Sequence, residues 1–228
     1  MGMSATPLRL VIFDVDGTLV DSQADILGAM QLAFDGQGMV TPARDQVLSV
    51  VGLSLDVLMR ELAPEADADT QARLVQGYKD AYMALRADQG AVLSSPFYPQ
   101  AREVLEHLHA RPDIVLGVAT GKSRRGLDKL IEAHGLQGMF VTQQVADFHP
   151  SKPHPAMLSA ALEEAGVQAK NAVMVGDTSF DMEMAQAAGI TGIGVRWGYH
   201  PATRLTAAQH MIDRFDALPV LLDRIFKG

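Results

Sequence analysis

Short apolar runs rich in β-branched residues constrain the fold of this 228-residue chain more than any other feature of its sequence. The first run is LRLVIFDV at residues 8–15, and similar runs lie at residues 114–119, 171–176 and 190–195. Nearly continuous runs of this kind are typical of strands that are buried on both faces of a parallel sheet. Because helical patterns separate them, the sequence predicts an α/β fold with a doubly wound parallel sheet.

The segment of residues 22–94 interrupts this alternation of strands and helices. It carries several amphipathic helical stretches, the longest at residues 69–87, and no convincing strand pattern. An all-helical block of this size indicates an inserted module. We therefore expect an α/β core formed by residues 1–21 and 95–228, and a helical cap domain formed by residues 22–94.

The composition limits the partners of the chain. Its 19 basic and 27 acidic side chains give a formal net charge of -8, so we expect no nonspecific binding to nucleic acid or to an anionic membrane. The absence of cysteine excludes disulfides and thiolate metal sites. No apolar stretch reaches the roughly 18 residues of a membrane span, and no signal peptide is evident. We expect a cytoplasmic protein, and the sequence leaves its oligomeric state open.

The motif DVDGTLVDS places two carboxylates, Asp14 and Asp16, at the carboxyl end of the first predicted strand. The strand period of two points both side chains the same way, toward the edge where ligands of open α/β sheets bind. Neighbouring carboxylates repel each other, so the pair requires a cation, a shared proton or both. The alternative is an ordinary polar turn, in which Asp and Gly are common.

The motif VATGKS at residues 118–123 follows the second predicted strand. The hydroxyl of Thr120 and the free amides of Gly121 and Lys122 could hold phosphate oxygens at the start of the next helix. A P-loop needs four residues between its two glycines, and the spacing here is one residue too short. The alternative is a helix start that is simply capped by a polar side chain.

The motif SKPHP at residues 151–155 holds Lys152 in a turn bounded by prolines. Pro153 and Pro155 restrict the backbone, so this lysine has less freedom than a typical surface lysine. An ordinary solvated lysine is the alternative. His149 and His154 lie nearby, but they lack partners at metal-ligand spacing and are interpreted as loop residues.

The motif VGDTSFDMEMA at residues 175–185 places Asp177 at the end of a further predicted strand and Asp181 in the first turn of the following helix. The helix dipole alone would favour an acidic residue at position 181. Oxygen ligands from Asp14, Asp16 and Asp177, together with water and a substrate phosphate, are what Mg²⁺ prefers. The sequence therefore predicts a magnesium site at these strand ends.

Taken in this order, the four motifs resemble those of the haloacid dehalogenase superfamily over essentially the whole chain. The helical insert after the first motif resembles the first cap class of that superfamily. The WGYH sequence at residues 197–200 and VATGKS look most like the phosphoglycolate phosphatase subgroup. Relatives that cleave carbon–halogen bonds or phosphonates lack the second aspartate of the first motif. This chain has it as Asp16, which disfavours both chemistries.

The resemblance implies a Mg²⁺-dependent phosphatase that hydrolyses a small phosphorylated metabolite similar to phosphoglycolate. Asp14 would form an aspartyl-phosphate, and Asp16 would be the general acid and then the general base. Thr120, Gly121 and Lys152 would hold the phosphate. Asp181 would orient Lys152 or a metal-bound water. Charge balance supports a metal as well, because four carboxylates and one lysine would repel a phosphate dianion.

Other functions share the same core motifs. A sugar phosphomutase is disfavoured because such mutases usually carry a histidine soon after the first motif, whereas residues 23–26 are Gln, Ala, Asp and Ile. A pyrophosphatase or a nucleotidase of the same fold stays open. A noncatalytic phosphate-binding protein would usually have lost a catalytic carboxylate, and here all are present.

Substrate specificity is expected in cap loops that face the site. The candidate is VGLS at residues 51–54, with Gly52 and Ser54, although Gly52 could be only a helix breaker. Several basic residues could contact a second anionic group of the substrate, but any one of them is expected to be a solvated surface residue. They are Arg44, Arg60, Lys122 and Arg124.

Overall fold

A parallel β-sheet forms the centre of the computed structural model, which describes residues 7–227 except for the side chains of residues 88, 89, 91 and 227. The strand order is β3-β2-β1-β4-β5-β6, and all neighbouring strands are parallel. The strands are β1 (Arg9–Phe13), β2 (Ile114–Thr120), β3 (Phe140–Val145), β4 (Ala172–Gly176), β5 (Thr191–Val195) and β6 (His210–Ile212). The predicted parallel α/β sheet is confirmed.

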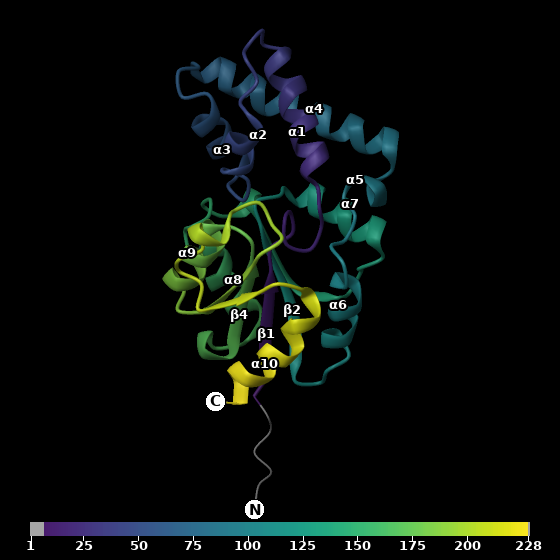
Figure 1. Ribbon diagram of the computed structural model, residues 1–228, viewed down its shortest axis with the longest axis vertical. Helices are drawn as coiled ribbons and strands as arrows, with labels where there is room; N and C mark the ends of the chain where they lie inside the picture. Colours follow the sequence, from purple (N-terminus) through teal and green to yellow (C-terminus); the bar gives the residue numbers. More distant parts are fainter. Residues whose placement is uncertain (1–6, 228) are drawn as a thin grey trace, which may run out of the picture.

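Helices cover both faces of this sheet (Figure 1). The α-helices of the core are α6 (Ala101–His109), α7 (Arg124–His134), α8 (Ala156–Ala165), α9 (Ser179–Ala187) and α10 (Leu218–Lys227). Four single 3₁₀ turns are η1 (Ala146–Phe148), η2 (Ala169–Asn171), η3 (Ala202–Arg204) and η4 (Phe215–Ala217).

The position of β1 between two apolar cores explains why its sequence is a nearly continuous apolar run. Val11 and Phe13 belong to the apolar core that contains residues of α6, α7 and α10, whereas Leu10 and Ile12 belong to the core on the other face, with residues of α8 and α9. Successive side chains of a strand point to opposite faces, so a strand covered on both faces needs apolar residues throughout.

Strands β3 and β6 were not among the predicted strands, and both lie at the edges of the sheet. The sequence of β3 is FVTQQV, and β6 has only three residues, HMI. Edge strands are often either short, as β6 is, or polar, as β3 is, because one side has no neighbouring strand. Neither sequence therefore stands out as a buried apolar run.

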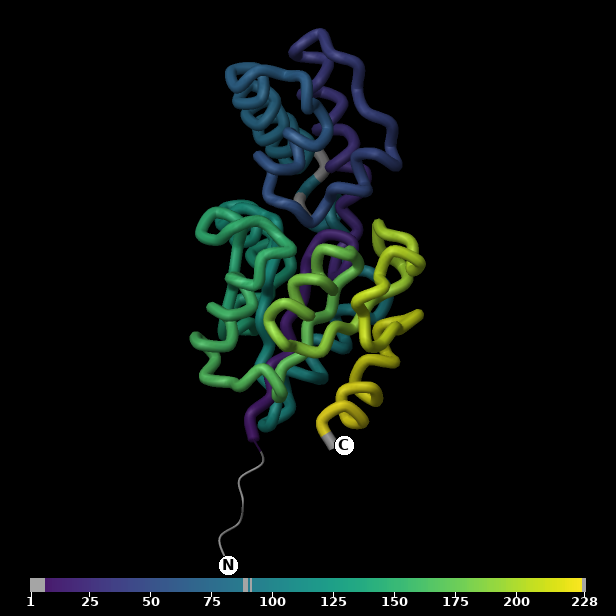
Figure 2. The backbone as a smooth tube through the Cα atoms, turned by 90° about the vertical axis from the view of Figure 1, so that its left-hand side faces the viewer, coloured from purple at the N-terminus to yellow at the C-terminus, as the bar shows by residue number. Residues whose placement is uncertain are grey.

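A helical block lies above the carboxyl ends of the strands (Figures 1 and 2). It consists of α1 (Gln23–Asp35), α2 (Arg44–Leu48), α3 (Leu55–Leu62), α4 (Ala68–Gln89) and α5 (Ala91–Ser94). It has an apolar core of its own, which includes the fully buried side chains of Met30, Phe34, Met59 and Leu74. The long predicted helix at residues 69–87 corresponds to α4. The domain boundaries at residues 22 and 94 stay a prediction.

The two connections between the core and the helical block lie side by side. The amide of Asp21 donates to the carbonyl of Pro96 at 2.8 Å, and the amide of Tyr98 donates to the carbonyl of Leu19 at 3.0 Å. At the base of the block, the hydroxyl of Ser94 donates to the buried carboxylate of Asp25.

Residues 7–227 contain no helix with the length and apolar character of a membrane span.

Candidate active site

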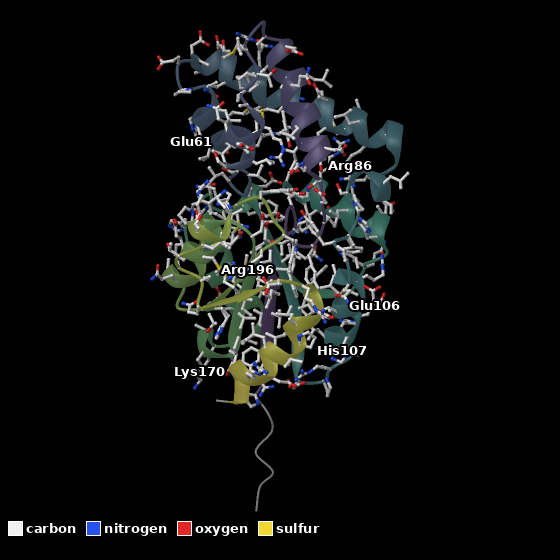
Figure 3. The ribbon with its side chains drawn as sticks, viewed as in Figure 1. Glu61, Arg86, Glu106, His107, Lys170 and Arg196 are labelled. Carbon is white, nitrogen blue, oxygen red and sulfur yellow. The ribbon has the colours of Figure 1, made fainter. Side chains whose placement is uncertain are left out.

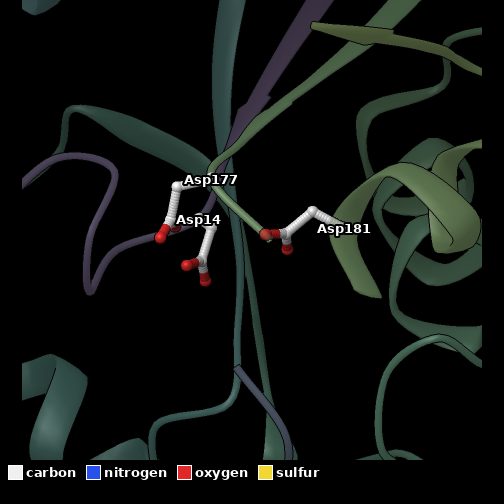
Figure 4. Close-up of side chains that lie close together, drawn as sticks. All are labelled: Asp14, Asp177 and Asp181. Carbon is white, nitrogen blue, oxygen red and sulfur yellow. The ribbon is translucent and has the colours of Figure 1, made fainter. Parts of the chain in front are cut away.

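Three buried carboxylates meet at the carboxyl ends of β1 and β4 (Figure 4). Asp14 follows β1 and Asp177 follows β4, and these strands are hydrogen-bonded neighbours, so their ends lie together. Asp181 reaches the same point from the first turn of α9. Asp14 is 2% exposed, and Asp177 and Asp181 are fully buried. One carboxylate oxygen from each residue lies within 4.8 Å of the others.

Lys152 is the cation of this carboxylate cluster. Its Nζ atom donates to Asp14 Oδ1 at 2.8 Å and to Asp181 Oδ1 at 2.6 Å, and its side chain is fully buried. Burial by itself would lower the pKa of Lys152, but the charges of Asp14 and Asp181 raise that pKa above its usual value. The alternative of an ordinary solvated lysine is therefore wrong.

Neighbouring hydrogen bonds fix the orientation of the other two carboxylates. Asp181 Oδ2 accepts from the amide of Thr178 at 3.0 Å and from its hydroxyl at 2.7 Å. The amide of Asp181 in turn donates to the hydroxyl oxygen of Thr178 at 3.2 Å, which completes a capping box at the start of α9. Asp177 accepts from the hydroxyl of Thr18 and from the amide of Tyr199, each at 2.8 Å. The carboxylates are thus held in place before any ligand binds.

The charges of this cluster fit a bound cation. Three carboxylates and the Lys152 ammonium leave two negative charges in a buried site, which one divalent cation would balance. Burial raises the pKa of Asp14 to about 7. The negative charge of Asp181 also raises this pKa, whereas the positive charge of Lys152 lowers it. Burial and the neighbouring charges of Asp14 and Asp181 also raise the pKa of Asp177. Clustered carboxylate oxygens suit hard cations such as Mg²⁺.

The Asp16 side chain lies outside this cluster, which contains Asp181 instead. Asp16 Oδ2 is 2.8 Å from the Nζ atom of Lys122, and Asp16 Oδ1 accepts from the hydroxyl of Ser22. The predicted ligand set of Asp14, Asp16 and Asp177 therefore differs from the carboxylates that the structure brings together. The role of Asp16 at a metal stays a prediction.

Lys122 is not the solvated surface residue that we expected. Its side chain is 9% exposed, and its Nζ atom lies between Asp16 and the hydroxyl of Tyr82, to which it donates at 3.3 Å. Burial by itself would lower the pKa of Lys122, but the charge of Asp16 raises that pKa above its usual value. By contrast, Arg44 and Arg60 are exposed, and Arg124 donates to Gln143.

The turn after β2 forms the cavity wall at Thr120 and Gly121. Thr120 Oγ1 accepts from the amide of Lys122 at 3.2 Å, so the interpretation of this amide as a free phosphate donor is wrong. The hydroxyl of Thr120 keeps its own proton for donation. The phosphate-binding role of Thr120 and Gly121 stays a prediction.

The predicted specificity loop at residues 51–54 touches the core beside this turn. A Cβ atom on Gly121 would lie 2.6 Å from the carbonyl oxygen of Gly52 and 2.7 Å from that of Leu53, so only glycine fits at position 121. The amide of Ser54 donates to the hydroxyl of Ser151 at 2.8 Å, and Gly52 has a φ of 106°. The loop therefore joins the helical block to the core at the mouth of the site.

The WGYH segment contributes contacts that the motifs did not reveal. The indole of Trp197 donates to the carbonyl of Thr18 at 3.1 Å. His200 Nδ1 accepts from the amide of Ser179 at 3.1 Å, so its Nε2 atom carries the proton and can donate to the carbonyl of Ser49 at 3.0 Å. Burial lowers the pKa of His200 to about 4, so the imidazole is neutral near pH 7.

A cavity of about 820 Å³ lies between the helical block and the core. Asp14, Asp16 and Thr120 line its floor, and Gly52 and Ser54 line it from the loop of the helical block. Several predicted site residues therefore face one space. The two histidines near Lys152 do not line it, and His149 is hydrogen-bonded to Gln144.

Comparison with known proteins identifies the family of this fold and site. The family model described as haloacid dehalogenase-like hydrolase matches residues 11–195, which is most of the chain. The chain belongs to the haloacid dehalogenase-like hydrolase family. This membership confirms the resemblance that the four motifs indicated.

Relatives within the haloacid dehalogenase-like hydrolases are similar over nearly the whole chain. The phosphoglycolate phosphatase of Vibrio parahaemolyticus is 30% identical over 214 residues, which cover 90% of this chain and 91% of that protein. The probable phosphatase IndB of Dickeya dadantii is 35% identical over 211 residues and 90% of each chain. A crystal structure of a predicted phosphoglycolate phosphatase from Haemophilus somnus has a TM-score of 0.82 and 25% identity, covering 96% of this chain and 100% of that one.

Proposed function

We propose that this chain is a magnesium-dependent phosphatase that hydrolyses small phosphomonoesters, similar to phosphoglycolate, through an aspartyl-phosphate on Asp14. The observation that carries this proposal is the position of Asp14: it is buried, paired with Lys152, and open to a cavity on its other side. The names of the relatives, phosphoglycolate phosphatase and probable phosphatase, support the same reaction.

In the first step, an Oδ atom of Asp14 attacks phosphorus and the bond from phosphorus to the ester oxygen breaks. Asp16 acts as the general acid and transfers a proton to the leaving oxygen, so an alcohol departs. Lys152 and the Thr120 hydroxyl contact the phosphoryl oxygens and stabilise their negative charge. Lys122 and Ser22 hold the Asp16 side chain at the cavity throughout.

In the second step, a water molecule attacks the phosphorus of the aspartyl-phosphate. Asp16, now a carboxylate, accepts the proton of this water, and the bond between phosphorus and Asp14 breaks. Inorganic phosphate leaves and the Asp14 carboxylate is regenerated. One acid and one base function therefore alternate on the same side chain, so no further titratable group is required.

The Asp14, Asp177 and Asp181 cluster, with Asp16 beside it, would hold Mg²⁺, which supplies charge neutralisation for the phosphate dianion when bound. We further propose that residues 22–94 act as a cap domain over the site.

The sugar phosphomutase alternative has weaker support: a β-phosphoglucomutase from Clostridium difficile shares only the fold, with 16% identity and a TM-score of 0.81.

The direct test is hydrolysis of p-nitrophenyl phosphate and of phosphoglycolate by the purified chain. We expect phosphate release with MgCl₂ and its loss in EDTA, with recovery when Mg²⁺ is added back, because the carboxylate cluster lacks enough positive charge to admit a phosphate dianion. Release that is unchanged in EDTA would refute the metal-dependent mechanism. Conversion of glucose 1-phosphate to glucose 6-phosphate without free phosphate would establish the mutase instead.

The raised pKa of Asp14 predicts how stability depends on pH without metal. The folded-state pKa is about 7 and the usual value is 3.8, so the folded protein binds the proton more tightly than the unfolded chain. The stabilising contribution of Asp14 is complete below pH 3.8 and is lost as the pH rises through about 7. Mg²⁺ replaces this proton, so we expect the Mg²⁺-induced rise in Tm to grow between pH 5 and pH 8. Thermal unfolding at constant ionic strength measures this rise, and a rise that is equal at both pH values would contradict the prediction.

A further inference from the structure

A ridge of side chains on α4 faces the cavity beside the candidate active site. Tyr78, Tyr82 and Arg86 recur at every fourth position, so they lie on one face of the helix, and all three line the cavity. The rings of Tyr78 and Tyr82 stack with centroids 5.8 Å apart and 26° between their planes. Apolar side chains complete this wall of the cavity: Ile26, Val51, Leu53, Leu58, Val75 and Met83.

The ridge begins directly at the proposed acid. The Nζ atom of Lys122 is 2.8 Å from Asp16 Oδ2 and 3.3 Å from the hydroxyl of Tyr82. The same atom lies 5.3 Å from the centroid of the Tyr82 ring. A single lysine side chain therefore separates the Tyr82 ring from the carboxylate that would protonate the leaving oxygen. The space in front of the two tyrosines is therefore next to the position of the leaving oxygen.

Arg86 provides an unused hydrogen-bond donor at the C-terminal end of the ridge. Its Nη2 atom is buried and has no hydrogen-bond partner in the part of the chain that the structure describes. Its guanidinium carbon lies 6.0 Å from the centroid of the Tyr82 ring. Figure 3 shows Arg86 on the cap, near the junction with the core. Arg86 also lines the cavity, so a turn of its guanidinium would bring this donor to an acceptor on a ligand and recover the free energy that a buried donor without a partner costs.

The cavity is much larger than the smallest phosphomonoesters. Its volume of about 820 Å³ lies within the range of pockets that hold drug-sized ligands. A two-carbon ester such as phosphoglycolate, with its phosphorus at Asp14, would be too small to cover both stacked tyrosines and also reach Arg86. The apolar wall would then face water, which is unfavourable.

We propose that the preferred substrate is a phosphomonoester whose alcohol carries a planar unsaturated ring with a hydrogen-bond acceptor, either a carbonyl oxygen or a carboxylate. The ring packs against Tyr82 and Tyr78, because aromatic rings prefer stacked or edge-on contacts with one another. The acceptor receives a hydrogen bond from the guanidinium of Arg86 after this group turns toward the cavity. This inference rests on the proposed phosphatase function, and it replaces small esters similar to phosphoglycolate with ring-bearing esters as the preferred substrates.

A series of esters with matched leaving groups tests the ring. Benzyl phosphate and cyclohexylmethyl phosphate have similar size and similarly unactivated alcohols, so a difference in kcat/KM reports contact with the ring. We expect kcat/KM to be about tenfold higher for benzyl phosphate. The better of 3- and 4-carboxybenzyl phosphate should gain about another tenfold through Arg86. Phosphoglycolate should be a poorer substrate than either.

Variants of the ridge assign these gains to individual side chains. Tyr78→Leu should lower the ratio of kcat/KM between benzyl and cyclohexylmethyl phosphate, because one of the two tyrosine rings is lost. Arg86→Gln should remove the gain from the carboxylate, whereas Arg86→Lys should keep part of that gain. The matched control is Arg73→Gln, because Arg73 lies exposed on the same helix and donates to Gln37. It should change none of the ratios.

The outcomes separate this inference from the function on which it rests. Equal kcat/KM for benzyl and cyclohexylmethyl phosphate, or phosphoglycolate as the best substrate, would overturn the ring proposal and leave the phosphatase intact. Hydrolysis of no ester would overturn the phosphatase. In that case calorimetry with Mg²⁺ and the same esters still tests the ring proposal. Tighter binding of benzyl phosphate than of cyclohexylmethyl phosphate supports it, and equal Kd values reject it.

Discussion

Replacing Asp14 by asparagine is expected to reduce phosphatase turnover by about 10⁴-fold or more, because an amide oxygen cannot form the acyl phosphate. The side chain keeps its shape and can still accept from Lys152. One negative charge leaves a cluster in which burial already raises the pKa of Asp14 to about 7. We therefore expect the metal-free Asp14→Asn protein to be at least as stable as the parent at pH 8. Phosphate release and urea unfolding measure the two effects.

Asp25→Asn is the matched control for this variant. Asp25 is also a buried aspartate, but it bonds to Ser94 at the base of the helical block and lies outside the carboxylate cluster. Asparagine can accept the same hydrogen bond from Ser94, so this variant should keep its metal-dependent turnover. Normal turnover by Asp14→Asn would exclude Asp14 as the nucleophile. Loss of turnover in both variants would show that the effect is not specific to the cluster.

The convergence of the core carboxylates could be predicted because parallel strands end at the same edge of a sheet. Asp14 and Asp177 each follow an apolar run, and their strands proved to be neighbours. The proline-bounded turn of Lys152 likewise indicated a restrained lysine, and the side chain is fully buried. In these cases the course of the backbone determines where the functional group lies. The hydrophobic pattern of the sequence predicts this course well, because it locates the strands and their ends.

The side-chain directions outside the strands could not be predicted in the same way. Lys122 follows a strand end, but its long side chain turns toward Asp16 and Tyr82, a direction set by how the helical block packs on the core. The fourfold spacing of the α4 ridge is visible in the sequence. Which face of that helix lines the cavity depends on the tertiary packing of the helix. The helical period of 3.6 residues per turn in the sequence does not reveal this packing.

Removing the charge of Lys152 is the second substitution for which we expect a large effect. Its Nζ atom bonds to Asp14 and Asp181, and all three groups are almost fully buried. In Lys152→Met both carboxylates lose their cation, and breaking a buried ion pair in this way typically costs about 3–5 kcal/mol. The phosphoryl oxygens also lose a donor, which typically lowers kcat by about 10²- to 10³-fold. Urea unfolding and single-turnover phosphate release measure the two effects.

The way in which the stability loss of Lys152→Met depends on pH and on Mg²⁺ distinguishes an electrostatic role of the lysine from a role in packing. The lost stability of Lys152→Met should be smaller at pH 5 than at pH 8, because burial raises the pKa of Asp14 to about 7 and Asp14 is therefore protonated at pH 5. Mg²⁺ should recover part of it, since it restores positive charge to the cluster. Lys170→Met, a substitution at an exposed lysine of the η2 turn, should change neither stability nor turnover. A stability loss in Lys152→Met that is the same at both pH values and insensitive to Mg²⁺ would mean that the lysine acts through its aliphatic packing.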